Sequence, residues 1–116
     1  MPKKLIKSFS YAGAGAKYAL QTQRNLLIHF IIGLTVISFA AWAKVGLIEL
    51  AILVLAVFGV IVMELINTAI EELVNILSPE RRKEAALAKN VAAAAVLLAA
   101  VGVVIISVII LISRWL

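Results

Sequence analysis

Three long stretches of apolar residues dominate the chain, at 26–43, 45–77 and 91–112. The second stretch is almost entirely apolar up to Met63 and carries a row of polar residues beyond it. A helix needs about 20 apolar residues to cross a bilayer, and strands are much shorter than these stretches. The pattern therefore predicts three transmembrane helices and an all-α fold.

A segment at 3–21 precedes the first span and has a different pattern. Helices with one apolar face and a basic opposite face lie in the plane of the membrane interface. We therefore expect an amphipathic surface helix here. Its apolar residues recur at spacings of three and four, with the lysines elsewhere, and they are Leu5, Phe9, Ala12, Ala16 and Ala19.

The composition agrees with an integral membrane protein of one domain, residues 1–116. Hydrophobic residues make up 65% of the 116 positions and the mean hydropathy is +1.15, whereas soluble domains are about 45–50% apolar. Cysteine is absent, which excludes disulfides and thiolate metal sites in this chain.

Basic residues are distributed unevenly between the two sides of the predicted spans. Of the 11 Lys and Arg residues, only Lys44 and Arg114 fall on the side of the 44–46 turn. Basic residues collect on the cytoplasmic side of membrane proteins, so we expect the N-terminus and the 78–90 loop to face the cytoplasm. Anionic headgroups then account for the net charge of +5. A phosphate-bearing substrate would also suit it, and no nucleic-acid partner is needed.

The break between the second and third spans falls at Ser78 and Pro79. Serine is a common residue just before a helix, and proline suits the first helical position. We expect Ser78 to cap the third transmembrane helix and Pro79 to begin it.

Polar residues of the second span form a stripe on one face of the predicted helix. A carboxylate near hydrocarbon is costly, so the carboxylate deepest in the span marks a candidate functional site. At 3.6 residues per turn, spacings of 3, 4, 7 and 11 return to nearly the same face. The residues of this stripe are Glu64, Asn67, Thr68, Glu71 and Asn75.

Two acidic residues of the stripe each have two interpretations. Glu64 is either a neutral carboxyl group hydrogen-bonded to a neighbour, or a general base or ion site. Glu71 is either a ligand of a divalent metal or the partner of a loop arginine. Glu72 lies off the stripe and is interpreted as solvated, and His29 as a hydrogen-bonded residue at the membrane interface.

Soluble nucleotide-binding loops are not part of this sequence, because neither G-x-x-x-x-G-K-[ST] nor G-x-G-x-x-G occurs in it. Three spans also make a thin bundle that hides Glu64 poorly from lipid, so we expect a homo-oligomer. From the residues alone, two classes of function stay open. One is an enzyme that acts on phosphate, metal and lipid, and the other is a transporter of ions or protons.

Three blocks of the sequence resemble a known family. Residues 64–71 read E-L-I-N-T-A-I-E, residues 87–96 read L-A-K-N-V-A-A-A-A-V, and residues 23–29 read Q-R-N-L-L-I-H. They are similar to E-x-x-N-[ST]-A-[IV]-E, to A-K-D followed by small residues, and to E-x-N-x-x-I-H. These are motifs of the bacterial membrane diacylglycerol kinase and undecaprenol kinase family. The block at 23–29 ends in histidine, and in this respect it looks closer to the undecaprenol kinase branch of the family.

The resemblance implies a homotrimer in the bacterial inner membrane that uses ATP and Mg²⁺ to phosphorylate a lipid hydroxyl at the cytoplasmic interface. Glu64 would be the catalytic base, and Glu71 with Gln23 would hold the metal. Lipid contacts would come from Glu64, His29 and Asn25. Nucleotide contacts would come from Asn67, Glu71, Glu80, Arg81, Arg82, Lys89, Asn90, Tyr11 and Gln23.

Amides stand at three positions where the family's pattern has a carboxylate, namely Gln23, Asn75 and Asn90. An amide is a weaker ligand for Mg²⁺ than a carboxylate. The three amides are therefore expected to reduce turnover, and Gln23 most of all, because it weakens the metal pair with Glu71. The alternatives are a small oligomeric transporter or channel subunit that uses Glu64, and a catalytically inactive relative of the kinases.

Overall fold

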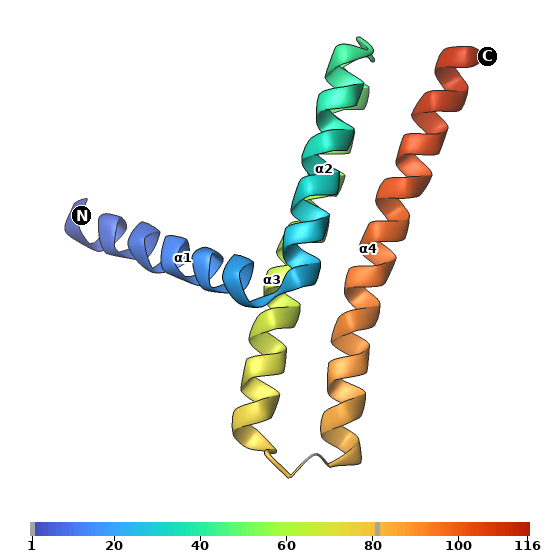
Figure 1. The fold of residues 1–116 in the computed structure, drawn as a ribbon. Helices are drawn as coiled ribbons and strands as arrows, with labels where there is room; N and C mark the ends of the chain where they lie inside the picture. The colour runs from blue at the N-terminus through green and yellow to red at the C-terminus, as the bar shows by residue number, and fades with distance from the viewer. Residues whose placement is uncertain (1, 81) are drawn as a thin grey trace.

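The structure, a computed structural model, describes residues 2–80 and 82–116 (Figure 1). These residues form four helices and no strand, which confirms the all-α prediction. Three of the helices, α2 to α4, are long and apolar enough to cross a membrane. The helices are α1 (Pro2–Thr22), α2 (Arg24–Trp42), α3 (Leu47–Leu77) and α4 (Lys83–Trp115).

Helix α3 is the centre of the bundle, because α2 and α4 both pack against it (Figure 1). At 1.5 Å per residue, the 31 residues of α3 and the 33 of α4 extend about 46 and 50 Å, against about 30 Å of hydrocarbon. The joined ends of α3 and α4 accordingly reach past the level where α1 meets α2 (Figure 1). The third predicted span, 91–112, is the central part of a helix that begins earlier, at Lys83.

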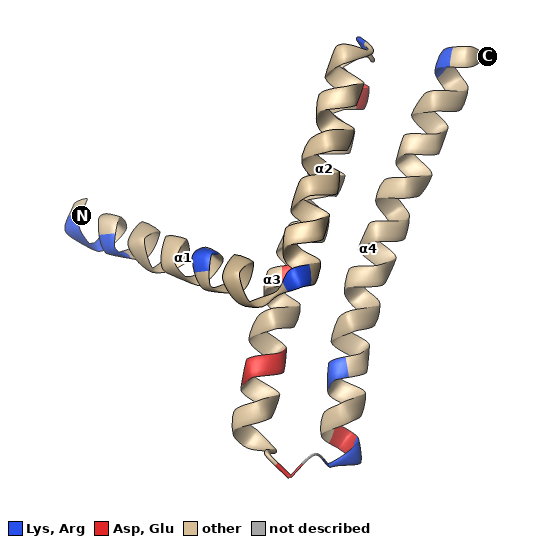
Figure 2. Cartoon of the chain, in the orientation of Figure 1, with Lys and Arg blue, Asp and Glu red and all other residues tan. Residues whose placement is uncertain are grey.

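Helix α1 leaves the bundle sideways and touches α2 and α3 near its C-terminal end (Figure 1). Ala19 is its buried residue. Charged residues collect on α1 and around the α3–α4 connection, with a smaller group at the opposite end of the bundle (Figure 2). The position of α1 in the membrane interface stays a prediction.

The turn between α2 and α3 is closed by backbone hydrogen bonds. Lys44 has a φ of 59°, in the left-handed region. Its N–H donates to the carbonyl of Ala41 at 3.1 Å, and the N–H of Val45 donates to that of Ala40 at 3.3 Å. This pair of bonds is the Schellman motif, which satisfies the last carbonyls of a helix.

The connection between α3 and α4 differs from the prediction. Ser78 ends α3, and its N–H donates to the carbonyl of Val74 at 2.8 Å. Pro79 and Glu80 then form a turn, and α4 begins at Lys83. The prediction that Ser78 caps α4 and Pro79 begins it is therefore wrong, because the chain needs this turn to reverse direction first.

The contact between α2 and α3 is close at one glycine. A Cβ added to Gly33 would lie 2.5 Å from Cγ1 of Val57, which is inside van der Waals contact. Glycine therefore lets the two backbones approach at this level. The other buried residues of these two helices are mostly small or apolar, among them Leu26 and Ala40 on α2 and Leu53 and Val60 on α3.

Replacing Gly33 with alanine is expected to destabilise the bundle by about 1–3 kcal/mol, because Val57 is buried and β-branched and cannot move aside freely. Thermal unfolding in detergent measures the effect. Gly59→Ala is the control, since nothing lies within 4 Å of a Cβ at that position. Gly33→Ala combined with Val57→Ala is expected to recover part of the loss. Equal melting temperatures for Gly33→Ala and the parent would contradict the close contact.

Candidate active site

The deepest polar residue of α3, Glu64, is paired with α2. Its side chain is 4% exposed, and its Oε1 lies 2.6 Å from Nδ1 of His29. The backbone carbonyl of Glu64 accepts a hydrogen bond from the hydroxyl of Thr68 at 2.9 Å. The α2–α3 contact thus holds a carboxylate and an imidazole together where the surroundings are mostly apolar.

Exposure rises along the stripe from Glu64 towards the end of α3. Glu64 and Thr68 are buried, Asn67 and Glu71 are half-buried, and Asn75 is exposed. The amide nitrogen of Asn67 donates to Oε1 of Glu71 at 3.4 Å. The face that was expected to carry the polar residues therefore runs from the apolar interior to the solvated end of the bundle.

The donors around Glu71 fit a hard divalent cation such as Mg²⁺. The side-chain oxygen of Asn67 is buried and has no hydrogen-bond partner among the described residues. Amide and carboxylate oxygens are the donors that Mg²⁺ prefers. Glu71 and Asn67 together could therefore hold the metal, although residues 2–80 and 82–116 contain no cluster of three or more His, Cys, Asp or Glu side chains.

Gln23, the other expected metal ligand, lies at the junction of α1 and α2. It is the residue before the first turn of α2, and its side chain makes no capping hydrogen bond. In a single copy of the chain, no hydrogen bond among the described residues joins Gln23 to Glu71. Its role at a metal stays a prediction.

Basic residues line a cleft of about 640 Å³ between the joined ends of α3 and α4. Lys89 donates to the side-chain oxygen of Asn75 at 2.5 Å, and Arg82 pairs with Glu80 at 3.2 Å. Asn75, Ser78, Arg82 and Lys89 all border the cleft. Two cations beside a polar cleft suit a phosphate group. Arg81, also expected at the nucleotide, lies outside the described residues.

A hydrogen bond between α1 and α3 was not predicted from the sequence. The hydroxyl of Tyr18 on α1 donates to Oε1 of Glu72 at 2.9 Å, across 54 positions. This hydrogen bond, together with the carboxylate charge, raises the pKa of Tyr18 above its ordinary value of 10.0. The protonated phenol joins α1 to α3 through this hydrogen bond. Glu72 is exposed, as expected, but it also has this partner.

Three of the expected nucleotide and lipid residues remain apart from these pairs. Tyr11 is 72% exposed and lies eight residues before Ala19, about 12 Å along α1 from the contact with the bundle. Asn25 and Asn90 are exposed as well. Among the described residues, no side-chain hydrogen bond joins Tyr11, Asn25 or Asn90 to the stripe.

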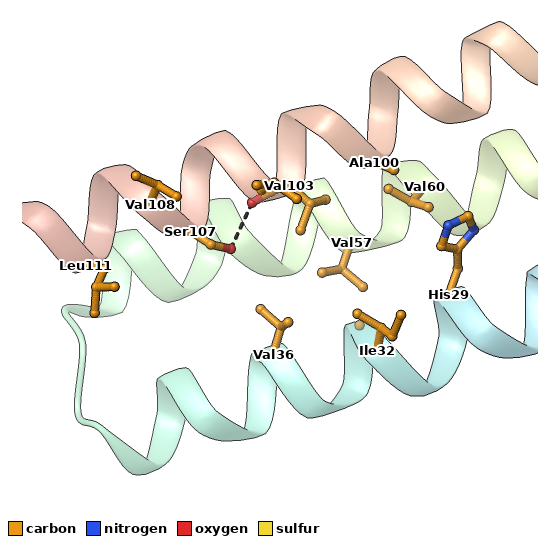
Figure 3. A pocket seen from close by; sticks show the side chains of 12 residues that line it. His29, Ile32, Val36, Val57, Val60, Ala100, Val103, Ser107, Val108 and Leu111 are labelled. Carbon is orange, nitrogen blue, oxygen red and sulfur yellow. Dashed lines mark hydrogen bonds between the residues drawn. The ribbon is translucent and has the colours of Figure 1, made fainter.

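An apolar cavity of about 450 Å³ lies between α2 and α4 over the middle of α3. His29 lies at one end of it and Leu111 at the other (Figure 3). The hydroxyl of Ser107 already donates to the carbonyl of Val103 at 2.8 Å. The cavity is therefore suited to a hydrocarbon chain with a polar group at the His29 end.

Comparisons with known proteins agree with the three sequence blocks. Residues 10–111 match the family described as prokaryotic diacylglycerol kinase. A diacylglycerol kinase of Synechocystis sp. is 42% identical over 90 residues, which cover 77% of this chain and 51% of that protein. The undecaprenol kinase of Bacillus subtilis is 32% identical over 90 residues, covering 78% of this chain and 73% of that protein.

The chain thus spans about half the length of the Synechocystis relative (51%) and most of the Bacillus one. The family match includes α2, α3 and the part of α4 that carries Lys89, and so contains every residue paired above. The chain belongs to the prokaryotic diacylglycerol kinase family.

Proposed function

We propose that the chain phosphorylates the hydroxyl group of a membrane lipid, undecaprenol or diacylglycerol, with MgATP as the phosphate donor. The observation that carries this proposal is Glu64, a buried carboxylate at the end of the α2–α3 contact. It lies two helical turns before Glu71 on the same face of α3. A base deep in the stripe and donors for metal and phosphate nearer its solvated end are the parts that phosphoryl transfer needs.

In this mechanism the lipid oxygen attacks the γ-phosphorus of ATP. The new O–P bond forms while the bond from that phosphorus to the β,γ-bridging oxygen breaks, and ADP leaves with the bonding electron pair. Glu64 accepts the proton of the lipid hydroxyl. Lys89 and Arg82 offset negative charge on the phosphates. Mg²⁺ held by Glu71 and Asn67 would supply further charge neutralisation on the phosphates.

The apolar cavity supports a lipid as the acceptor. It runs from His29, which is bonded to the proposed base, towards Leu111 (Figure 3). A lipid whose hydroxyl lies at Glu64 could place hydrocarbon along this cavity. The test is transfer of labelled phosphate from ATP to a panel of lipid alcohols by the purified protein in micelles. Transfer to none of them would overturn the proposal and favour an inactive relative.

A homotrimer is the assembly that we propose. In a single copy, only 6% of the most apolar 18-residue stretch of α4 is buried. Tyr11 is 72% exposed and lies on the part of α1 that extends beyond the bundle. Neighbouring copies would cover part of α4 and could supply Tyr11 to an adjacent site. Native mass spectrometry in mild detergent tests this assembly, and a dominant monomer would contradict it.

The bacterial inner membrane is the location that we propose, with the N-terminus in the cytoplasm. The support is the positive-inside pattern, in which only Lys44 and Arg114 of the 11 Lys and Arg residues lie on the other side. This orientation would open the cleft beside Lys89 to the cytoplasm, where ATP is available.

Replacing Gln23 with glutamate is expected to raise kcat/KM at limiting Mg²⁺ by about 10-fold, because it restores a carboxylate at the proposed metal site. Initial rates over a Mg²⁺ titration measure the change. Asn75→Asp is the matched control: Asn75 already accepts a hydrogen bond from Lys89, and an exposed ion pair there adds little. A larger gain from Asn75→Asp than from Gln23→Glu would show that Gln23 is not at the metal.

A further inference from the structure

The bond between His29 and Glu64 joins two helices at a fixed level. The residues are 35 positions apart, with 2.6 Å between Nδ1 and Oε1. This is shorter than the usual 2.9 Å or so of a hydrogen bond between an N–H and a neutral oxygen. Within residues 2–80 and 82–116, no other side chain hydrogen-bonds to the Glu64 carboxylate.

Packing on both sides of the pair limits how it can move. On α2, buried Leu26 lies one turn before His29 and buried Gly33 one turn after it. Gly33 lies directly against Val57, which is two turns before Glu64 on α3. The backbone spacing at His29 is therefore set by contacts that do not depend on the imidazole itself.

We propose that His29 is a positioning residue for the catalytic carboxylate of Glu64. Its Nδ1–H donates to Oε1 and holds the carboxylate in one rotamer, so that Oε2 is left to accept the proton of the lipid hydroxyl. This inference rests on the proposed function of Glu64 as the base. It assigns His29 to the carboxylate, in place of the direct contact with lipid that the sequence resemblance implies.

Substitutions of His29 can be chosen by where each new side chain places a hydrogen-bond donor. The amide nitrogen of asparagine occupies nearly the place of Nδ1 in histidine, whereas that of glutamine reaches nearly the place of Nε2. His29→Ala is expected to lower kcat by about 10-fold, with the KM for ATP unchanged. His29→Asn is expected to recover most of this loss, and His29→Gln much less. Equal kcat for His29→Ala and the parent would overturn the proposal.

A double-mutant cycle separates positioning from general support of the fold. If His29 acts through Glu64, His29→Ala should have no further effect on kcat in a Glu64→Gln protein. An independent loss of about 10-fold in that background would overturn the proposal. Thermal unfolding of each variant in detergent is measured alongside kcat. If His29→Ala and His29→Asn both lose activity only in proportion to the loss of folded protein, the positioning role is contradicted.

A spectroscopic measurement does not depend on kinase activity. The chain contains one histidine, so the ¹⁵N spectrum of labelled protein reports on His29 alone. A ring protonated at Nδ1 is expected in the parent, with resonances that shift in Glu64→Gln. A ring that is insensitive to this substitution would overturn the pair itself. If the parent phosphorylates no lipid alcohol while the spectrum behaves as expected, the pair stands and the proposed function, with the catalytic role of His29, fails.

Discussion

Replacing Glu64 with glutamine is expected to lower kcat for lipid phosphorylation by about 10²- to 10⁴-fold, which is the usual contribution of a general base. Glutamine keeps the size of the side chain and can still hydrogen-bond to His29, but it cannot accept the hydroxyl proton. The Kd for ATP is expected to stay within about twofold of the parent value, because the proposed phosphate contacts are Arg82, just before α4, and Lys89, on α4. Single-turnover transfer and equilibrium ATP binding measure the two effects.

The matched control for Glu64 is Glu49→Gln, which changes another glutamate of α3. Glu49 lies at the opposite end of the helix, where its Oε1 accepts the backbone N–H of Gly46 at 3.0 Å. Its replacement is expected to change thermal stability slightly and kcat by no more than about twofold. If Glu64→Gln weakens ATP binding by the same factor as it lowers kcat, then Glu64 supports the structure of the site and does not act as the base.

Helix positions were predictable because they depend on local periodicity. The apolar stretches were long enough to admit only helices, and the lysines of α1 fell outside its apolar spacing. The stripe on α3 was predictable for the same reason, since Glu64 and Asn67 lie on one face of any regular helix. Helix boundaries were less well predicted: α4 begins at Lys83, because the turn at Pro79 is decided by how the chain reverses and not by capping preferences.

Pairs between helices could not be predicted in the same way. The bond from Tyr18 to Glu72 depends on the direction in which α1 leaves the bundle, and no spacing in the sequence encodes it. The bond from His29 to Glu64 depends on the depth at which Gly33 lets α2 approach α3. The presence of a polar residue is thus a property of the sequence, whereas its partner is a property of the packing.

Replacing Glu71 with glutamine is expected to lower kcat/KM by about 10²-fold at limiting Mg²⁺. Glu71 is the one carboxylate left of the proposed metal pair, because Gln23 already supplies an amide. The substitution therefore leaves the metal without any carboxylate from the pair, and the loss should shrink as Mg²⁺ is raised.

Glu72→Gln is the control for this substitution, because it removes the adjacent negative charge from the same turn of α3. Glu72 bonds to Tyr18 and points to α1, so its replacement should change kcat/KM by no more than about twofold. Initial rates for both variants over a Mg²⁺ titration decide between a metal site and a general electrostatic effect. Equal losses in the two variants would mean that the charge of this turn matters and that Glu71 binds no metal. A loss confined to Glu71→Gln and relieved by Mg²⁺ would locate the metal on the stripe, two turns from the proposed base.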